Sequence, residues 1–168
     1  MGMRSDHQTG TTYGRKGITP LIPGTGQRFR CSMISAITNR GRLYFMVYRQ
    51  GFSAKVFIAF LRRLTRQIDH NLYVIVDGHP VHRSQETKHW IEKQKGRIQL
   101  FYLPGYSPEL NPDELLNQDV KSNAVGRRRP HTQSEMINTV RSFLHQRQKQ
   151  PEKVLSHFHE KHVQYAAL

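Results

Sequence analysis

The sequence predicts an α/β protein in which helices flank a mixed β-sheet, folded as a single domain over residues 1–168. Its length suits one domain that buries a substantial core. Two neighbouring runs, 28–38 and 43–48, show the alternation of an antiparallel hairpin. Two later apolar runs, 72–76 and 98–103, are separated by a helical pattern, which is the order that produces parallel strands.

The first half of the chain is expected to contain a loop, the hairpin and a helix. Residues 1–27 are rich in Gly, Thr, Pro and Arg without a clear period, and they predict an extended loop. A turn at 39–41 joins the two strands of the hairpin. Ser53 is then a favourable N-cap for a helix. The apolar residues of that helix recur at helical spacing: Val56, Phe57, Phe60, Leu61, Leu64 and Ile68.

The second half alternates strands and helices. Because residues 72–76 are continuously apolar, they predict an interior strand covered on both faces. The later elements are a helix over 84–94 capped by Ser84, a strand over 98–103, a helix over 112–122, a basic break at 127–130, a long helix from Thr132 and a last segment after Pro151. An RNase H-like architecture has this order, with antiparallel strands first and parallel strands with crossover helices after them. The chain follows it from the second strand, so the first strand is expected to be missing.

The chain is strongly basic, with 26 Lys and Arg against 12 Asp and Glu, a net charge of +14 and a pI near 10.4. This surplus favours nucleic acid or another polyanion as partner, because each phosphate that is neutralised releases a condensed counterion. The alternative is a basic protein without a specific partner. The charge is uneven, since Asp6 is the only acid ahead of Asp69. Such asymmetry suits an enzyme that grips a nucleic-acid backbone with one region and cuts it with another.

Cys31 is the only cysteine, so a single chain forms neither a disulfide nor a thiolate zinc site. This composition is typical of a reducing, intracellular setting. No stretch approaches the roughly 20 apolar residues that span a bilayer, and the N-terminus lacks the apolar stretch of a secretion signal. We expect a cytoplasmic protein that makes no membrane contact.

Asp77 is the first residue with a chemical interpretation. It directly follows the apolar run 72–76, and functional sites in open α/β sheets gather at the carboxyl ends of strands. Gly78 allows backbone or ligand to approach closely. The alternative is an Asp that closes the strand by accepting a hydrogen bond from its own backbone. The segment alone does not decide between the two.

Glu114 is the second such residue, at the opening of the helix predicted over 112–122. Asn111 is a good N-cap and Pro112 suits the first helical position, so Glu114 has a structural alternative as the partner of a capping box. Paired with Asp77 in a basic chain it gains a chemical meaning, because hard divalent cations require carboxylate oxygens from separate elements. Two Mg²⁺ or Mn²⁺ ions, roughly 3.5–4 Å apart, would then support in-line attack of water or a 3′-hydroxyl on a phosphodiester.

Basic residues near these acids are expected to contact DNA. The run Arg127, Arg128 and Arg129 favours a phosphate clamp over a simple charged loop, and Lys121 belongs to the same expected DNA surface. His79 is close enough in sequence to the first acid to orient a phosphate or a water, although it also suits a cap at the strand exit.

Other residues favour structural interpretations. Direct metal ligation by His79 or His82 is disfavoured at an oxygen-preferring site. The residues His157, His159 and His162 lack the cysteines or acids of a zinc motif and suit a solvated helix face. Tyrosines 102 and 106 could stack on a base, but tyrosines at such places more often pack at a strand end.

Two segments resemble a known family. Val76-Asp-Gly-His-Pro-Val-His82 and Leu103-Pro-Gly-Tyr-Ser-Pro-Glu-Leu-Asn-Pro-Asp-Glu114 resemble the catalytic segments of DDE transposases, in the mariner-like branch found in bacterial insertion sequences. The resemblance covers nearly the whole chain. It implies an RNase H-like fold, two Mg²⁺ ions and cut-and-paste DNA strand transfer. The second acid of the family corresponds to Asp77 and the third to Glu114, whereas Asp113 is not assigned as a ligand.

The first Asp of the family does not correspond to any residue here. In similar proteins it precedes a stretch like Gly2-Met-Arg-Ser-Asp6, and Asp6 aligns with a later, non-catalytic Asp. We therefore expect a transposase catalytic domain that is truncated at its start, lacks an upstream helix-turn-helix region and is inactive as written. The alternatives are a non-enzymatic DNA-binding remnant and a standalone RNase H-like nuclease. A homodimer is compatible with the synapsis of two DNA ends.

Overall fold

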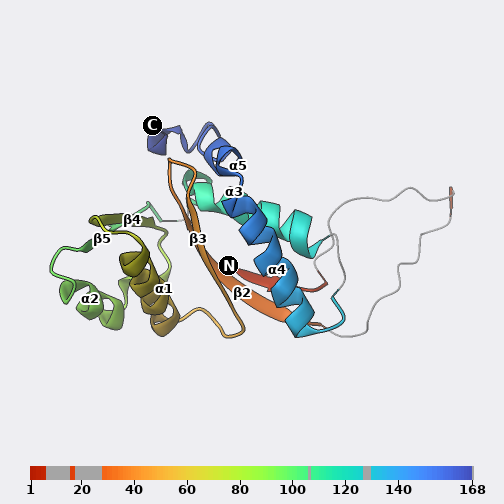
Figure 1. Ribbon diagram of the computed structural model, residues 1–168, viewed down its shortest axis with the longest axis horizontal. Coiled ribbons are helices and arrows are strands. Elements are labelled where there is room, and N and C mark those ends of the chain that lie inside the picture. The colour runs from red at the N-terminus through yellow and green to blue at the C-terminus, as the bar shows by residue number, and fades with distance from the viewer. Residues whose placement is uncertain (7–15, 18–27, 106, 127–129, 168) are drawn as a thin grey trace.

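The computed structural model describes residues 1–6, 16–17, 28–105, 107–126 and 130–167. A three-stranded antiparallel sheet consists of β1 (Gly2–Arg4), β2 (Arg30–Ile37) and β3 (Leu43–Tyr48), in that order. A parallel pair consists of β4 (Leu72–Val76) and β5 (Ile98–Tyr102). The β2–β3 hairpin runs through the middle of the molecule, between α1 and α4 (Figure 1). The predicted α/β class, with antiparallel strands, parallel strands and flanking helices, is confirmed.

The helices follow the predicted order closely. They are α1 (Ala54–Gln67), α2 (Gln85–Glu92), α3 (Pro112–Val120), α4 (Gln133–Gln148) and α5 (Pro151–Ser156). Short 3-10 turns lie at Pro80–Arg83, Pro108–Leu110 and Gln164–Ala166, and a π-helical turn at Lys121–Val125 continues α3 beyond its predicted end. The predicted N-caps Ser53 and Ser84 accept a hydrogen bond from a backbone N–H of the first turn, and Thr132, where the long helix was predicted to begin, does the same for α4.

The prediction that the first strand is missing is wrong for residues 2–4. These residues form β1, which pairs with β2 in the register Gly2↔Ser32, Met3↔Cys31 and Arg4↔Arg30. The strand has only three residues, too few to show a period, but its central Met3 is almost fully buried. Burial of Met3 and a ladder of backbone hydrogen bonds thus replace the loop that composition had indicated. Residues 7–15 and 18–27 of that expected loop lie outside the described residues.

The hairpin turn depends on Gly41. Its φ is +76°, a left-handed conformation that glycine adopts without steric cost. A Cβ atom at this position would lie 2.7 Å from the backbone oxygen of Pro151, at the start of α5. The hairpin turn therefore packs closely against the C-terminal helix, and a side chain at position 41 would disrupt both the turn and this contact.

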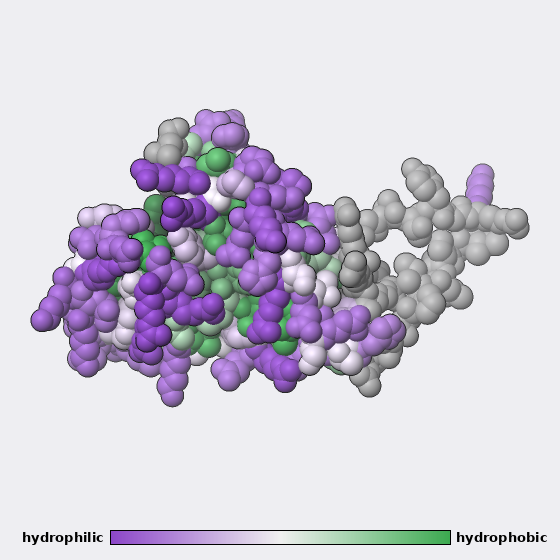
Figure 2. Space-filling model, in the orientation of Figure 1, coloured by the Kyte–Doolittle hydropathy of each residue, from purple (hydrophilic) through white to green (hydrophobic). Residues whose placement is uncertain are grey.

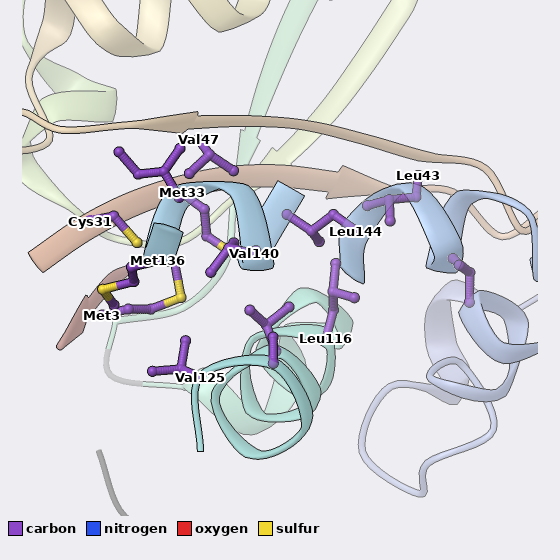
Figure 3. Close-up of a cluster of buried hydrophobic side chains, with 14 residues drawn as sticks. Met3, Cys31, Met33, Leu43, Val47, Leu116, Val125, Met136, Val140 and Leu144 are labelled. Carbon is purple, nitrogen blue, oxygen red and sulfur yellow. The ribbon is translucent and has the colours of Figure 1, made fainter. Parts of the chain in front are cut away.

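Each face of the hairpin packs against a separate hydrophobic cluster. Residues 31, 33, 43 and 47 face α3 and α4, and Figure 3 shows the buried side chains of this first cluster. Residues 34, 36, 44 and 46 pack against the second cluster, which α1, β4 and β5 build. The result is a layered arrangement in which helices cover both faces of β2 and β3. At about 25 cal/mol per Å² of buried apolar surface, these two clusters are the main favourable contribution to folding.

One face of β4 and β5 is exposed, contrary to the prediction that residues 72–76 are covered on both faces. Leu72 and Val76 are buried against the second cluster, whereas Tyr73 and Ile75 are 65% and 52% exposed, and Phe101 of β5 is 49% exposed. Hydrophilic residues cover most of the face seen in Figure 2, and hydrophobic residues reach the surface near its middle. Among the described residues, no helix has the length and apolar character needed to cross a membrane.

Candidate functional site

Asp77 lies directly after β4, at the carboxyl end of the parallel pair. The end of this pair is held by a hydrogen bond that the backbone N of Leu103 donates to the backbone oxygen of Val76, at 2.8 Å. The Oδ1 atom of Asp77 accepts hydrogen bonds from the backbone N of His79 and from Nδ1 of His82, both at 3.0 Å. The hydrogen bond from His82 is the largest cause that lowers the pKa of Asp77 to about 2. The side chain is half exposed and ionised at neutral pH.

His82 is a site residue whose importance the sequence did not reveal. Its side chain is buried and lies against the rings of Phe52 and Phe57, with ring centroids 5.5 Å and 4.5 Å away. Its Nδ1 atom lies 3.0 Å from Oδ1 and 3.2 Å from the backbone oxygen of Asp77. An N–H at Nδ1 donates to both oxygens, so the aromatic pocket orients the imidazole and the imidazole orients the acid. A His five positions after the acid was the signal, and the 3-10 turn between them brings the two together.

His79 has a local role as well. Its Nδ1 atom accepts a hydrogen bond from the backbone N of Val81 at 3.2 Å, so His79 caps the 3-10 turn that follows rather than the exit of the strand. The side chain is exposed, next to Asp77. Its ring lies 5.0 Å from that of Phe52, the same ring that contacts His82.

Glu114 occupies the first turn of α3, as predicted. The cap residue Asn111 accepts a hydrogen bond from the backbone N of Asp113 at 3.1 Å. The Oε1 atom of Glu114 accepts a hydrogen bond from Nδ2 of Asn117 at 3.1 Å, one turn further along the helix. The backbone N of Asn111 instead donates to the carbonyl of Pro108, so the capping-box alternative is not formed. The carboxylate of Glu114 is thus held from the C-terminal side.

Asp113 is the least expected member of the group. Its Oδ2 atom accepts a hydrogen bond from the hydroxyl of Ser35 on β2, at 2.8 Å. Its Oδ1 atom is buried and has no hydrogen-bond partner among the described residues. Burial is the main cause that raises the pKa of Asp113 to about 6, with the charges of Glu114 and Asp77 acting in the same direction.

The acids share one electrostatic neighbourhood. The terminal ammonium of Met1 donates a hydrogen bond to the backbone oxygen of Met33 at 2.7 Å. Burial is the main cause that lowers the pKa of this ammonium, and the positive charge of Lys121 lowers it further. The negative charges of Asp113, Glu114 and Asp77 raise it. Carboxylates from the end of β4 and from the start of α3 therefore both act electrostatically on this ammonium. Lys121 contributes a second positive charge to this neighbourhood.

The oxygen donors suit a hard divalent cation, but they do not complete a metal centre. Asp77 and Glu114 each use one carboxylate oxygen in the contacts described above, and carboxylates on separate elements are the ligands that Mg²⁺ or Mn²⁺ requires. Among the described residues, no three His, Cys, Asp or Glu side chains form a group that could hold a metal ion. The two carboxylates therefore supply only part of a set of ligands.

The other predicted contact residues have different surroundings. Arg127, Arg128, Arg129 and Tyr106 lie outside the described residues. The hydroxyl of Tyr102 donates to the backbone oxygen of His82 at 3.2 Å, and the guanidinium of Arg83 lies 4.5 Å from the centre of the Tyr102 ring. Tyr102 therefore packs at the strand end, which was the structural alternative for it.

The comparison with protein families is decisive. The model described as "DDE superfamily endonuclease" matches residues 1–137. The chain belongs to this family. The match includes both acidic segments, and it confirms the resemblance to DDE enzymes drawn from residues 76–82 and 103–114.

Two individual proteins show how far the similarity extends. The chain is 30% identical over 94 residues to the insertion element IS630 uncharacterized 39 kDa protein of Shigella sonnei, which covers 55% of this chain and 27% of that protein. The aligned region thus spans about a quarter of the relative. A crystal structure of the catalytic domain of Mos1 mariner transposase is similar at a TM-score of 0.49 and 15% identity, over 76% of this chain and 74% of that one.

Proposed function

We propose that this chain carries the catalytic region of an insertion-sequence transposase, which cuts and joins DNA by metal-dependent phosphoryl transfer. The observation that supports it most directly is that the charges of Asp77, at the end of β4, and of Glu114, in the first turn of α3, both act on the Asp113 carboxyl and on the ammonium of Met1. Membership of the DDE endonuclease family and similarity to an insertion-element protein support the same conclusion. The strongly basic composition suits DNA as the substrate.

The chain's own residues would divide the work as follows. Asp77 and Glu114 are the proposed ligands of two divalent cations, Mg²⁺ or Mn²⁺. When bound, such ions supply a stronger nucleophile and stabilise the leaving oxygen. His82 keeps Asp77 ionised and oriented, and Asn117 holds one oxygen of Glu114. The protein therefore contributes mainly fixed carboxylate geometry and a positive surrounding field.

We propose that Lys121 and His79 contact the DNA backbone beside these acids, together with Arg127, Arg128 and Arg129. Lys121 lies in the same electrostatic neighbourhood as the carboxylates, and His79 is exposed next to Asp77. When a Lys or Arg that neutralises one phosphate is removed, about one counterion fewer is released on binding, and the salt dependence of the binding constant becomes weaker. Lys121→Gln should therefore reduce the slope of log K against log salt by about 0.9 for duplex DNA.

The experiment that tests the proposal combines metal binding with DNA cleavage. The Mn²⁺ dissociation constant would be measured by electron paramagnetic resonance for the wild-type chain and for Asp77→Asn and Glu114→Gln. We expect each substitution to weaken binding by at least about 10-fold, because loss of even an outer partner of a metal ligand costs that much. Asp69→Asn, which changes an exposed acid outside the site, is the matched control and should bind Mn²⁺ like the wild type.

Cleavage of supercoiled DNA in Mn²⁺ is the second readout. We expect the chain as printed to nick DNA weakly or not at all, because two of the three acids of the family have a counterpart in its sequence. Nicking that is strong in the wild type and absent in Asp77→Ala would contradict this expectation of inactivity while supporting the site. Nicking that persists in both Asp77→Ala and Glu114→Ala would show that these acids are not the active site.

The net charge of +14 also favours a second function, that of a DNA binder without catalysis. Such a protein needs no divalent ion, and its affinity for DNA is unchanged when Asp77 is replaced by Asn. Binding to a short duplex, measured with and without EDTA, separates this possibility from a metal-dependent enzyme.

A further inference from the structure

We propose that Ser35 is a positioning residue, which acts through Asp113 to set the orientation of the first turn of α3 and thereby of the Glu114 carboxylate. The inference rests on the proposed function, in that Glu114 is taken as a ligand of a divalent cation. It concerns a contact between β2 and α3 that neither motif contains, because Ser35 and Asp113 are 78 positions apart.

Ser35 is a polar residue at a position where the strand pattern calls for an apolar one. Residues at 31, 33 and 35 share the face of β2 that α3 and α4 cover, and Cys31 and Met33 on this face are fully buried in the first hydrophobic cluster. Ser35 is partly buried at this place, so its hydroxyl loses part of its contact with water and gains from a protein partner. That partner is Asp113.

Asp113 is also unfavourable as a purely structural residue. Its carboxylate is buried with a single hydrogen bond from Ser35, and its Oδ1 atom has no partner among the described residues. Two apolar residues of similar size would stabilise the same interface without any cost of removing polar groups from water. Departures of this kind from optimal packing are expected where a protein keeps a residue for its function.

The geometry of α3 explains what the contact can do. Successive residues of an α-helix are rotated by about 100° around its axis, so the direction of Asp113 determines the direction of Glu114. The contacts of Asn111 and Asn117 lie within α3 and its cap, whereas the contact of Asp113 with Ser35 joins the helix to the sheet. On the sheet side Ser35 is held by the pairing of β2 with β3, in which it lies opposite Phe45, and β1 pairs with the start of the same strand at residues 30–32.

The experiment compares substitutions of Ser35 that differ in the hydroxyl alone. Thr and Val have nearly the same shape and both suit a strand, so Ser35→Thr keeps the donor and Ser35→Val removes it at equal volume. Ser35→Ala removes it without added volume. Ser32→Ala is the matched control, since it removes a hydroxyl from the opposite face of the same strand. Each chain would be titrated with Mn²⁺ by electron paramagnetic resonance, and its thermal unfolding followed in EDTA.

We expect Ser35→Val and Ser35→Ala to raise the Mn²⁺ dissociation constant about 10-fold, the low end of the range for loss of a direct outer partner of a ligand, because Ser35 reaches Glu114 only through Asp113. Ser35→Thr and Ser32→Ala should stay within about 2-fold of the wild type, the scatter allowed by unrelated small changes. Ser35→Val with the Mn²⁺ affinity of Ser35→Thr would overturn the inference, whatever happens to the melting temperature. A loss in Ser32→Ala equal to that in Ser35→Ala would overturn it as well.

Failure of the proposed function has a different signature. If Glu114→Gln and Asp77→Asn bind Mn²⁺ as well as the wild type does, the two acids are not the metal site. If these two variants lose affinity while Ser35→Ala and Ser35→Val do not, the metal site stands and only the role of Ser35 is refuted.

Discussion

Replacing Asp113 by Asn should make the protein more stable at neutral pH. The folded protein holds this carboxyl at a pKa of about 6, against an ordinary value of 3.8. At about 1.4 kcal/mol per pKa unit, the ionised carboxylate costs roughly 3 kcal/mol in the folded state. Asn has no charge to bury and keeps an oxygen that accepts the hydrogen bond from Ser35. The gain is therefore expected to approach 3 kcal/mol, an upper value if the site relaxes around the charge.

The sign of the pH dependence follows from proton binding. Between pH 3.8 and about 6 the folded state keeps the proton on Asp113 and the unfolded state releases it, so stability falls as pH rises through this window. Below pH 3.8 both states are protonated, and Asp113→Asn should match the wild type closely. The advantage of the variant should then grow up to pH 6 and stay constant above pH 7.

Urea denaturation in EDTA at pH 4, 5, 6, 7 and 8 measures this directly, with Asp69→Asn as the control for loss of an exposed acid. The difference in unfolding free energy between Asp113→Asn and wild type should increase with pH, while that of the control stays flat. A difference that is constant from pH 4 to pH 8, or one that shrinks, would refute the buried, high-pKa carboxyl.

Other perturbations should give equally definite results. The pKa of Asp77 is lowered to about 2, so its pH dependence has the opposite sign: in EDTA its contribution to stability is present above pH 4 and is lost on acidification towards pH 2. Asp77→Asn should therefore lower the free energy of unfolding in urea at pH 7 but not at pH 2. His82→Ala should weaken Mn²⁺ binding by about 10-fold or more and lower the melting temperature, whereas an unchanged Mn²⁺ affinity would separate the histidine from the site. Arg147 pairs with Asp119 at 2.5 Å and both side chains are largely buried, so Arg147→Ala should lower the free energy of unfolding by about 3–5 kcal/mol. Adding Asp119→Ala should restore part of this loss, as a double-mutant cycle would measure. Gly41→Ala should destabilise by more than about 1 kcal/mol in thermal unfolding, because both its φ and the nearby Pro151 oxygen oppose a Cβ; a neutral result would contradict the turn geometry.

Local patterns were sufficient to predict most of the fold. The hairpin strands, four of the five helices and the strands at 72–76 and 98–103 were visible because apolar spacing and N-cap residues are local signals, which Ser53 and Ser84 illustrate. The strand at Gly2–Arg4 was missed because three residues contain no period, and its formation depends on pairing with a distant strand. The exposed face of β4 was missed because a continuous apolar run does not reveal which neighbours cover it.

The members of the candidate site could be predicted only where they lie in contiguous motifs. Asp77 at the end of a strand and Glu114 at the start of a helix were both expected from their own segments, and the structure places them there. The partnership of Asp113 with Ser35 crosses 78 positions and has no local signature, so it required three-dimensional coordinates. The contact of His82 with Asp77 depends on the burial of the imidazole against Phe52 and Phe57, which is a property of tertiary packing and not of one segment.

The shared hairpin has a consequence for how the molecule unfolds. Since β2 and β3 contribute side chains to both hydrophobic clusters, neither cluster can open without exposing one face of the same two strands. The two halves are therefore expected to melt as one cooperative unit rather than as separate subdomains. Amide hydrogens of β2 near Ser32, where the strand pairs with both β1 and β3, should exchange with solvent only through global unfolding, so their exchange rates would report the stability of the entire fold.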